Sequence, residues 1–488
     1  MKRISLSIFC IVLVLIQITA LSGCAKNEGE YYSVVEVVDD DTASNNASGK
    51  DNTVSNNASV NDNKSSQSNS TDSKVTSQTK KTVSKSGTWQ EVLKSMPKNL
   101  RGKELEIVSQ YPMSEIPGVA GAIKKFEKAS GMSVKWSYVQ FGNYESNLNT
   151  RMAADNPPDI VYTNAMVISR IQHFQPIKNL NFDFSGKEWD QQTIKAYTIK
   201  GNSYAVALSP EYTYQHQPQA MFYNKNLIKE YGFEDPYQLW KKGKWTFSKM
   251  LEMAKEYNKE TGNLGFSFGS IYEYPMMKGL CAGPFTFDGK TVGNTFKSVN
   301  LTTVFQEMSN WKEIGLLSNQ QQDEGPFINN KMLFYTFNFG TARSTNCHCL
   351  AMKENRSFGV APYPIPDGQK TYYAVMGEYE GYAVPKNAKY GEAMPYFIRC
   401  IFDKSNYDPN KYFCSPEALD VYNWSMKQKR VMQTSFLTGQ AQSNSSIEQM
   451  GYKLWAATSN AITTEIASGS NTIDRDVKSL NKTIKDNF

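Results

Sequence analysis

Short apolar runs alternate with longer amphipathic stretches between residues 105 and 163. Residues 105–110, 134–139 and 158–163 are short runs that contain several β-branched or aromatic residues, a composition that favours β-strands. Residues 119–131 and 144–155 instead carry apolar side chains three and four positions apart. That spacing predicts amphipathic helices, and a glycine ends the first of them. Strand, helix and strand in this order predict a parallel α/β layer.

The N-terminus carries an apolar run of a different kind. Two basic residues precede a mostly apolar stretch over residues 4–20, which has the charge and length of a secretory signal peptide and ends too soon for a membrane span. The next four residues, LSGC at 21–24, resemble the bacterial lipobox, in which the cysteine is lipidated and the chain is cut just before it. We therefore expect a lipoprotein signal peptide over residues 1–23 and a lipid on Cys24. The alternative is an ordinary cleaved signal in which this cysteine has no role.

A long polar segment follows the expected lipid anchor. From about residue 25 to 86 the chain is mostly Ser, Asn, Thr, Asp and Lys, with no aromatic residue after Tyr32. Such a segment buries too little apolar surface to offset the entropy of ordering it. We expect residues 24–87 to form a disordered linker, with a reach on the order of 40 to 45 Å for about sixty residues of this composition.

The rest of the chain, residues 88–488, is rich in Tyr and Phe and is too long for one hydrophobic core. We therefore expect two lobes. The formal net charge of +6 is spread along the chain, so no basic stripe indicates nucleic acid binding. A second hydrophobic stretch long enough to cross a bilayer is absent from the sequence.

Cysteine spacing carries little structural information. Cys10 belongs to the signal and Cys24 to the lipobox, which leaves an odd number of thiols without regular spacing. This pattern does not describe a disulfide framework, and it leaves any pairing open. The thiols concerned are Cys281, Cys347, Cys349, Cys400 and Cys414.

Five later blocks carry a family resemblance. The blocks PDIVYTN, IKAYTIKGNSYAVALSPE, MFYNKNLIKEYGFEDPYQLWKKGKWTFSKMLEMAK, FGVAPYPIPDG and EGYAVPKNAKYGEAMPYFI occur in this order between residues 158 and 398. They resemble the family 1 extracellular solute-binding proteins of ABC importers, over a region from about residue 100 to the C-terminus that is weakest after residue 409. The resemblance implies a sugar-binding type of substrate-binding lipoprotein with a two-lobed, periplasmic-binding-protein-like α/β fold.

The resemblance also implies a hinge, because the chain of such proteins crosses between lobes more than once. We place one crossing near residues 212–221 and a return near 376–381. Closure of the lobes on a ligand is then a hinge motion, stabilised by contacts that only the closed state makes. The expected first lobe comprises about 100–211 and 376–429, and the second comprises 212–375 and 430–488.

The candidate ligand site follows from strand ends and from the chemistry of sugars. Ligands of parallel α/β layers bind at the carboxyl ends of the strands, which directs attention to residues 111–115, Thr163 and Asn164. Sugars present flat C–H faces and many hydroxyls, so their sites combine aromatic rings with carboxylates, amides and hydroxyls. The candidates are Tyr111, Glu115, Asn164, Glu211, Tyr212, Tyr214, Tyr335, Phe337, Phe339, Glu378, Tyr379 and Glu380. Residues 334–339 form one predicted strand, of which only one face could meet the ligand.

Three motifs partly match catalytic or metal sites, but each match is incomplete. GFSFG at 265–269 matches a nucleophile elbow, but the polar NKETGNL precedes it in place of a hydrophobic strand, and only His348 follows as a base. CHC at 347–349 offers three ligands where a structural zinc site needs four. EYE at 378–380 resembles a glycosidase carboxylate pair in composition. Carboxylates two apart on one strand more often bind hydroxyls or face solvent.

The sequence therefore predicts a lipid-anchored receptor on the extracellular face of a Gram-positive-like cell membrane. We expect a monomer that captures a solute, an oligosaccharide by its site chemistry, and presents it to ABC permease subunits, with no cofactor, no metal and no catalytic step. One alternative is a surface carbohydrate or ester hydrolase that uses Ser267 or the glutamates. Another is a ligand-sensing or adhesion lipoprotein that has no permease.

Overall fold

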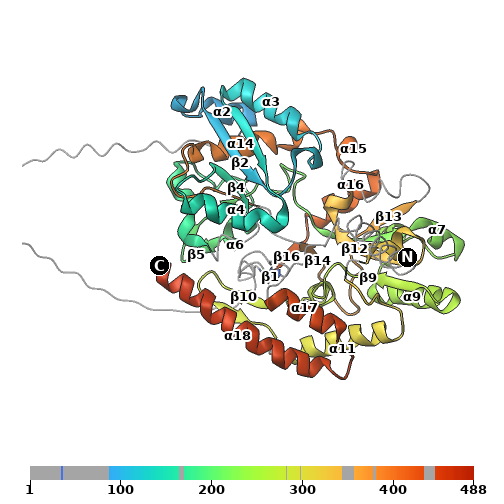
Figure 1. Ribbon diagram of the computed structural model, residues 1–488. Helices are drawn as coiled ribbons and strands as arrows, with labels where there is room; N and C mark the ends of the chain where they lie inside the picture. Colours follow the sequence, from blue (N-terminus) through green and yellow to red (C-terminus); the bar gives the residue numbers. More distant parts are fainter. Residues whose placement is uncertain are drawn as a thin grey trace, which may run out of the picture.

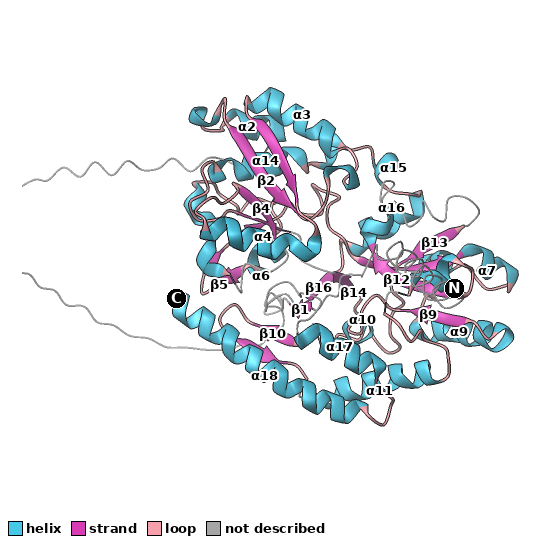
Figure 2. Ribbon diagram, in the orientation of Figure 1, coloured by secondary structure: helices cyan, strands magenta, loops and turns pink. Residues whose placement is uncertain are grey.

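A computed structural model places two β-sheets, each flanked by helices, at opposite ends of the molecule (Figures 1 and 2). The residues that it describes are 34–36, 87–163, 170–281, 283–296, 298–321, 323–342, 357–376, 381–433 and 446–488. Within these ranges no helix combines the length and the hydropathy that a membrane span requires. Several predicted residues lie outside the described ranges: Cys24, Asn164, Cys347, His348, Cys349, Glu378, Tyr379 and Glu380.

The first sheet has the strand order β3-β2-β4-β15-β7. Its three parallel strands are β2 (Glu104–Ser109), β3 (Ser133–Tyr138) and β4 (Ile160–Thr163), with β2 in the middle. This arrangement confirms the parallel α/β layer that the sequence predicts. Two antiparallel strands, β15 (Gly381–Ala383) and β7 (Ala205–Val206), extend the sheet beyond β4.

Helices with one apolar stripe cover this sheet. In α3 (Val119–Ser130) the buried positions recur at helical spacing, and Gly131 ends the helix with a φ of 73°, which favours glycine over other residues. The ring of Phe126 meets that of Phe397 in α14 (Met394–Ile401) at 5.2 Å, so α3 and α14 share one core. The other helices of this region are α2 (Trp89–Lys94), α4 (Phe141–Ala153) and α6 (Gln191–Ala196).

The second sheet has the order β13-β8-β12-β9. Its strands are β8 (Gln219–Asn224), β9 (Leu264–Ser267), β12 (Met332–Asn338) and β13 (Phe358–Ala361). β12 runs antiparallel to β8 and parallel to β9. The strand predicted at residues 334–339 is therefore a central strand of this sheet.

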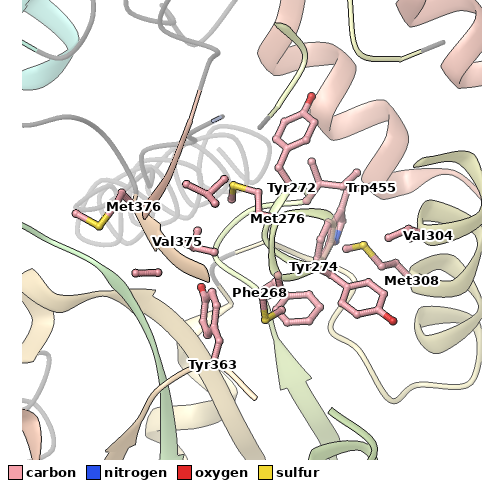
Figure 3. Close-up of a cluster of buried hydrophobic side chains, with 14 of the residues drawn as sticks. Phe268, Tyr272, Tyr274, Met276, Val304, Met308, Tyr363, Val375, Met376 and Trp455 are labelled. Atoms are coloured by element: carbon pink, nitrogen blue, oxygen red, sulfur yellow. The ribbon is translucent and has the colours of Figure 1, made fainter. Parts of the chain in front are cut away.

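The helices around the second sheet come from several parts of the chain. They are α7 (Lys225–Glu230), α8 (Pro236–Lys241), α9 (Phe247–Thr261), α10 (Glu273–Met277), α11 (Val299–Glu313), α12 (Glu324–Ile328), α15 (Pro409–Tyr412), α16 (Pro416–Ser425), α17 (Ser446–Ala456) and α18 (Ile462–Asn487). Helix α18 runs along the lower edge of the view in Figure 1 and packs against α11, α17 and β11. The largest core includes these helices and extends to one side of the first sheet, and Figure 3 shows the part that contains Phe268, Tyr274 and Tyr363.

Small strands complete the fold. β5 (Thr198–Ile199) and β6 (Asn202–Ser203) form one hairpin, and β10 (Phe285–Phe287) and β11 (Val292–Asn294) form another. A three-stranded sheet of order β1-β16-β14 combines β1 (Val34–Glu36), β16 (Lys429–Gln433) and β14 (Tyr373–Met376). Strand β1 lies within the segment expected to be a disordered linker. Its two consecutive valines suit a strand, which explains why part of that polar segment can add to a sheet.

The chain passes between the two large sheets along segments that are far apart in sequence. Residues 207–218 lead from β7 in the first sheet to β8 in the second, and residues 377–380 separate β14 from β15. An isolated antiparallel bridge joins Pro218 to Met376, so the end of one crossing segment lies beside the start of the other.

Candidate functional site

A row of aromatic side chains crosses the first sheet at the carboxyl ends of its parallel strands. Tyr138 of β3 is in register with Ser109 of β2, and Tyr382 of β15 is in register with Tyr162 of β4. The pairing of Val108 with Val161 places Ser109 beside Tyr162 one position further on. Because strand partners in register share a face, these four side chains form one row. The Tyr162 and Tyr382 rings meet at 5.7 Å with an interplanar angle of 75°.

Tyr111 extends this row beyond the end of β2. Its ring meets that of Tyr162 edge-to-face at 5.4 Å. The turn that carries Tyr111 is held from two sides: the Trp136 indole N–H donates to the Tyr111 carbonyl oxygen at 3.1 Å, and the Tyr111 N–H donates to Ser109 Oγ at 3.1 Å. Tyr111 is half-buried, so part of its side chain remains accessible.

The first crossing segment, residues 207–218, is attached to the tyrosine row through the side-chain amide of Gln215. Tyr382 Oη donates to Gln215 Oε1 at 2.8 Å, and the Gln215 N–H donates to Thr213 Oγ1 at 3.2 Å. The neighbouring His216 is buried, with Nε2 at 2.7 Å from the carbonyl oxygen of Leu208. These contacts fix the direction in which the segment leaves the first sheet.

The same segment meets the second sheet at the end of β12. The Phe339 N–H donates to the Pro218 carbonyl oxygen at 2.9 Å, and the Gly340 N–H donates to Asn338 Oδ1 at 2.9 Å. A Cβ at Gly340 would lie 2.5 Å from Gln217 Oε1 and 2.7 Å from Asn338 Oδ1. Glycine suits position 340, because a larger residue would force the amide ends of Gln217 and Asn338 to move.

Two buried polar atoms beside the crossing segments have no hydrogen-bond partner among the residues that the structure describes. They are Thr163 Oγ1 at the end of β4 and Gln219 Oε1 at the start of β8. Leaving a buried polar atom without a partner costs about 1 to 3 kcal/mol, and each such atom in a native fold calls for an explanation. A solute or an ordered water that donates or accepts at these positions would offset that cost.

Uncharged polar side chains gather in this region. They are amides and one hydroxyl, contributed by both sheets and by the segment between them: Gln110, Thr163, Gln215, Gln217, Gln219 and Asn338. Amides offer both hydrogen-bond donors and acceptors. Together with the tyrosine row they can hold an uncharged, hydroxyl-rich molecule by hydrogen bonds and ring contact, without bond making or breaking.

The structure separates the predicted site residues into groups. Tyr111 joins the row, and Glu115 is half-buried at the end of a short 3-10 turn, Met113–Glu115. Glu211 is exposed. The ring of Tyr212 packs against the core of the first sheet and faces the guanidinium of Arg399, with 5.1 Å between Arg399 Cζ and the ring centroid.

The predicted aromatic residues of the second sheet pack into a separate core. Tyr214 meets Tyr412 and Phe413, both at 5.4 Å. Tyr335 is only 3% exposed and stacks between Phe327 and Phe337, at 5.6 and 5.8 Å. Phe339 is likewise buried in this core, whereas Phe337 is half-buried at its margin.

Several residues of the candidate site were missing from the sequence prediction. Tyr138, Tyr162, Tyr382 and the amides join it through sheet register and through the crossing segment. One local signal could have identified part of the set: Gln215, Gln217 and Gln219 alternate in QHQPQ, inside the predicted crossing. No local pattern indicates Tyr382, because its neighbour Tyr162 is distant in sequence.

The GFSFG motif has a packing explanation. Ser267 is fully buried, and its Oγ lies 3.3 Å from both the Gln320 carbonyl oxygen and the Asp323 nitrogen. A Cβ at Gly265 would lie 2.7 Å from Leu316 Cδ1, and a Cβ at Gly269 would lie 2.6 Å from Glu273 Oε1. Close packing thus accounts for both glycines, and Ser267 is buried instead of exposed as a nucleophile.

Two buried carboxylates lie near the crossing segments. Asp190 is paired with Arg430, which joins the start of α6 to β16. Glu273 of α10 is buried, and this burial raises its pKa to about 7 against the opposing hydrogen bond from Thr336. Among the residues that the structure describes, no cluster of His, Cys, Asp and Glu could hold a metal ion. The described cysteines Cys281, Cys400 and Cys414 are free.

Two sheets joined by crossing segments that carry aromatic and amide side chains define a two-lobed, periplasmic-binding-protein-like fold. Residues 121–410 match the family described as bacterial extracellular solute-binding protein. The chain belongs to this family, which confirms the resemblance seen in the sequence. A comparison with curated proteins by sequence finds no match.

Solved structures share the fold at low sequence identity. The ABC substrate-binding protein Lmo0181 from Listeria monocytogenes, in complex with cycloalternan, is 15% identical with a TM-score of 0.57, over 76% of this chain and 98% of that one. The GacH receptor of Streptomyces glaucescens, solved unliganded and with acarbose, is 15% identical with a TM-score of 0.56, over 77% and 98%. The extracellular solute-binding protein from Staphylococcus aureus, in complex with maltose, is 14% identical with a TM-score of 0.55, over 77% and 98%.

Proposed function

We propose that this solute-binding protein captures an uncharged oligosaccharide and delivers it to an ABC importer. The observation that carries the proposal is the half-buried ring of Tyr111 together with the uncharged amides where the crossing segment meets both sheets. Rings contact the C–H faces of sugars, and amides donate to and accept from their hydroxyls. These rings and amides carry no charge themselves.

The proteins of similar fold support this choice of solute. Their structures hold cycloalternan, acarbose or maltose. In this chain, Tyr111 would supply the accessible ring beside the buried pair Tyr162 and Tyr382. Thr163 Oγ1 and Gln219 Oε1, which lack hydrogen-bond partners among the described residues, would gain such partners when the solute, or water held with it, is bound.

Capture in this proposal depends on two lobes that close by a hinge. We assign about residues 100–211 and 381–406 to the first lobe and the other residues after 211 to the second. The sequence expectation placed all of 376–429 in the first lobe, but α15 and α16 pack against the second sheet. The bridge between Pro218 and Met376 supports a hinge at the crossing segments, because it joins the residue before β8 of the second sheet to the end of β14, where the other chain passage begins. Contacts made only in the closed state would stabilise the complex.

The proposal includes a membrane anchor. A signal peptide over residues 1–23 directs secretion, and a lipid on Cys24 holds the monomeric protein at the extracellular face of the membrane, near its permease. The linker after Cys24 keeps the folded part within reach of the permease. No cofactor or catalytic step is required, because the protein only binds and releases its solute.

Calorimetric titration of the full chain, purified in detergent, with a panel of neutral oligosaccharides tests the proposal. The panel should contain gluco-, xylo-, galacto- and fructo-oligosaccharides of two to six units. We expect saturable one-to-one binding of at least one series, with the sugar recovered intact. Absence of binding across the panel, or release of a cleaved product, would contradict the proposed function. ATP hydrolysis by the reconstituted permease, stimulated by the loaded protein, tests the delivery step.

A further inference from the structure

The outermost ring of the tyrosine row differs from the others in exposure. Tyr138 lies at the carboxyl end of the edge strand β3 and is 50% exposed. The inner rings of the row, Tyr162 and Tyr382, are 3% and 4% exposed. Exposure therefore rises sharply at the edge of the sheet.

Strand geometry explains where the Tyr138 side chain lies. Val134, Trp136 and Tyr138 share one face of β3, and the first two pack against the core of the first sheet. Tyr138 is the next position on that face, but it extends beyond the core. Its register partner Ser109 is small, so no bulky side chain on β2 covers it.

Tyr138 has no stabilising partner of its own in the described structure. Neither a hydrogen bond nor a ring contact of its side chain is found among the described residues, whereas Trp136 and Tyr111 are joined by a hydrogen bond. The other exposed large apolar residues of the described chain lie on a helix, directly after one, or at the C-terminus: Val299, Ile314, Tyr452 and Phe488. Tyr138 thus differs from them in being at the carboxyl end of a strand of the parallel layer.

This position is where solutes of parallel α/β layers approach. Neighbouring strands are about 4.8 Å apart, so the end of β3 lies about 10 Å from the end of β4 across the sheet. A compact solute held at Thr163 and Tyr111 would not extend to Tyr138. A solute with further units along the row would reach it.

We propose that Tyr138 is an outer contact ring that selects longer oligosaccharides. Its exposed face stacks on a sugar unit beyond those held at Tyr111, so it adds affinity only for solutes long enough to cover it. This inference rests on the proposed function and adds that the site discriminates between solutes by their length. The half-exposed state suits the role, because a ring that is already covered by protein has no face left for a sugar.

The test compares chain lengths and variants. The full-length wild type, Tyr138→Ala and Tyr138→Phe are titrated by calorimetry with the two-unit to six-unit members of each series in the neutral panel. For the series that the wild type binds, we expect Tyr138→Ala to weaken the longest members about tenfold to a hundredfold, by analogy with truncated interface rings, and to leave the shortest unchanged. Tyr138→Phe keeps the ring, so it should bind like the wild type.

Two controls keep the test specific. Tyr452→Ala removes another exposed tyrosine, on α17, and should not produce a length-dependent loss. Melting temperatures should stay close to that of the wild type for Tyr138→Ala, because its ring is outside the core. Equal affinity of wild type and Tyr138→Ala at every length, or an equal loss at every length, would overturn the inference alone. A wild type that binds no member of the panel would overturn the proposed function and the inference together.

Discussion

Asp190 and Arg430 form a buried ion pair with two parallel hydrogen bonds. Arg430 Nη1 lies 2.8 Å from Asp190 Oδ2, and Nη2 lies 2.6 Å from Oδ1. Thr193 Oγ1 also donates to Asp190 Oδ2, at 2.6 Å. The pair joins α6, which flanks the first sheet, to β16, so it links the two regions through a contact whose side chains are only 5% and 4% exposed.

Removing one partner of this pair should destabilise the protein strongly. Asp190→Asn leaves the guanidinium of Arg430 buried without a counter-charge, and such losses typically cost 3–5 kcal/mol, so we expect about that decrease in the free energy of unfolding. Chemical denaturation monitored by circular dichroism measures it. The matched control is the surface pair of Lys241 and Asp420, whose side chains are 48% and 41% exposed. Asp420→Asn should cost about 1 kcal/mol or less, and an equal cost for both variants would show that burial does not matter.

The same pair predicts how stability changes in acid. Burial alone would raise the pKa of Asp190, but the charge and hydrogen bonds of Arg430 lower it to about 2, below the ordinary value of 3.8. A depressed pKa contributes stability above the unfolded value, and that contribution is lost as the pH falls from about 4 toward 2. Unfolding free energies of the wild type between pH 2 and 6 should show this fall, and Asp190→Asn should lack it.

Glu273 should make the protein less stable as the pH rises, whereas Asp190 makes it less stable as the pH falls. Burial raises the pKa of Glu273 from 4.5 to about 7, so the folded protein holds a proton that the unfolded chain releases. This contribution is fully present below about pH 4.5 and is lost as the pH rises through 7. Glu273→Gln keeps the shape without the titration, so its stability should depend less on pH between 5 and 8. Parallel stability curves for wild type and variant across that range would contradict the assignment.

Tyr111 and Tyr335 provide a direct comparison between a site ring and a core ring. Tyr111→Ala should weaken oligosaccharide binding about tenfold to a hundredfold, with little loss of stability, because its ring is only half-buried. Tyr335→Ala should remove a buried ring stacked on Phe327, which typically costs 3–5 kcal/mol of stability, and should preserve affinity at low temperature. Calorimetry measures the affinity of both variants, and thermal unfolding measures their stability. A loss of stability for Tyr111→Ala together with a loss of affinity for Tyr335→Ala would contradict the assignment of Tyr111 to the site and Tyr335 to the core.

Local patterns were sufficient for part of this fold. The strands β2, β3 and β4 and the helix α3 follow from periodicity, because each element's apolar positions lie close together in sequence. The burial of Tyr335 was not predictable in this way. Alternation along 334–339 defines two faces of β12, but only the position of α12, with Phe327, determines that this face is covered. Tyr382 and Gln215 enter the candidate site through pairing over long sequence separations, which no local pattern encodes.

The anchor at Cys24 can be tested independently of the ligand site. Cys24→Ser removes the thiol that would accept the lipid, so radiolabelled fatty acid should no longer be incorporated and the membrane-bound fraction should fall. Cys414→Ser is a suitable control, because that cysteine lies in the folded part. A wild type without incorporated label, or equal labelling of wild type and Cys24→Ser, would rule out this anchor.

The central claim is that two lobes joined at the crossing segments capture a solute between them. Small-angle X-ray scattering of the full chain in detergent matched to the solvent tests it most directly, with and without a saturating oligosaccharide identified by calorimetry. We predict a smaller radius of gyration in the saturated sample, because closure brings the two sheets together. Identical scattering curves, with binding verified in the same samples, would contradict capture by lobe closure.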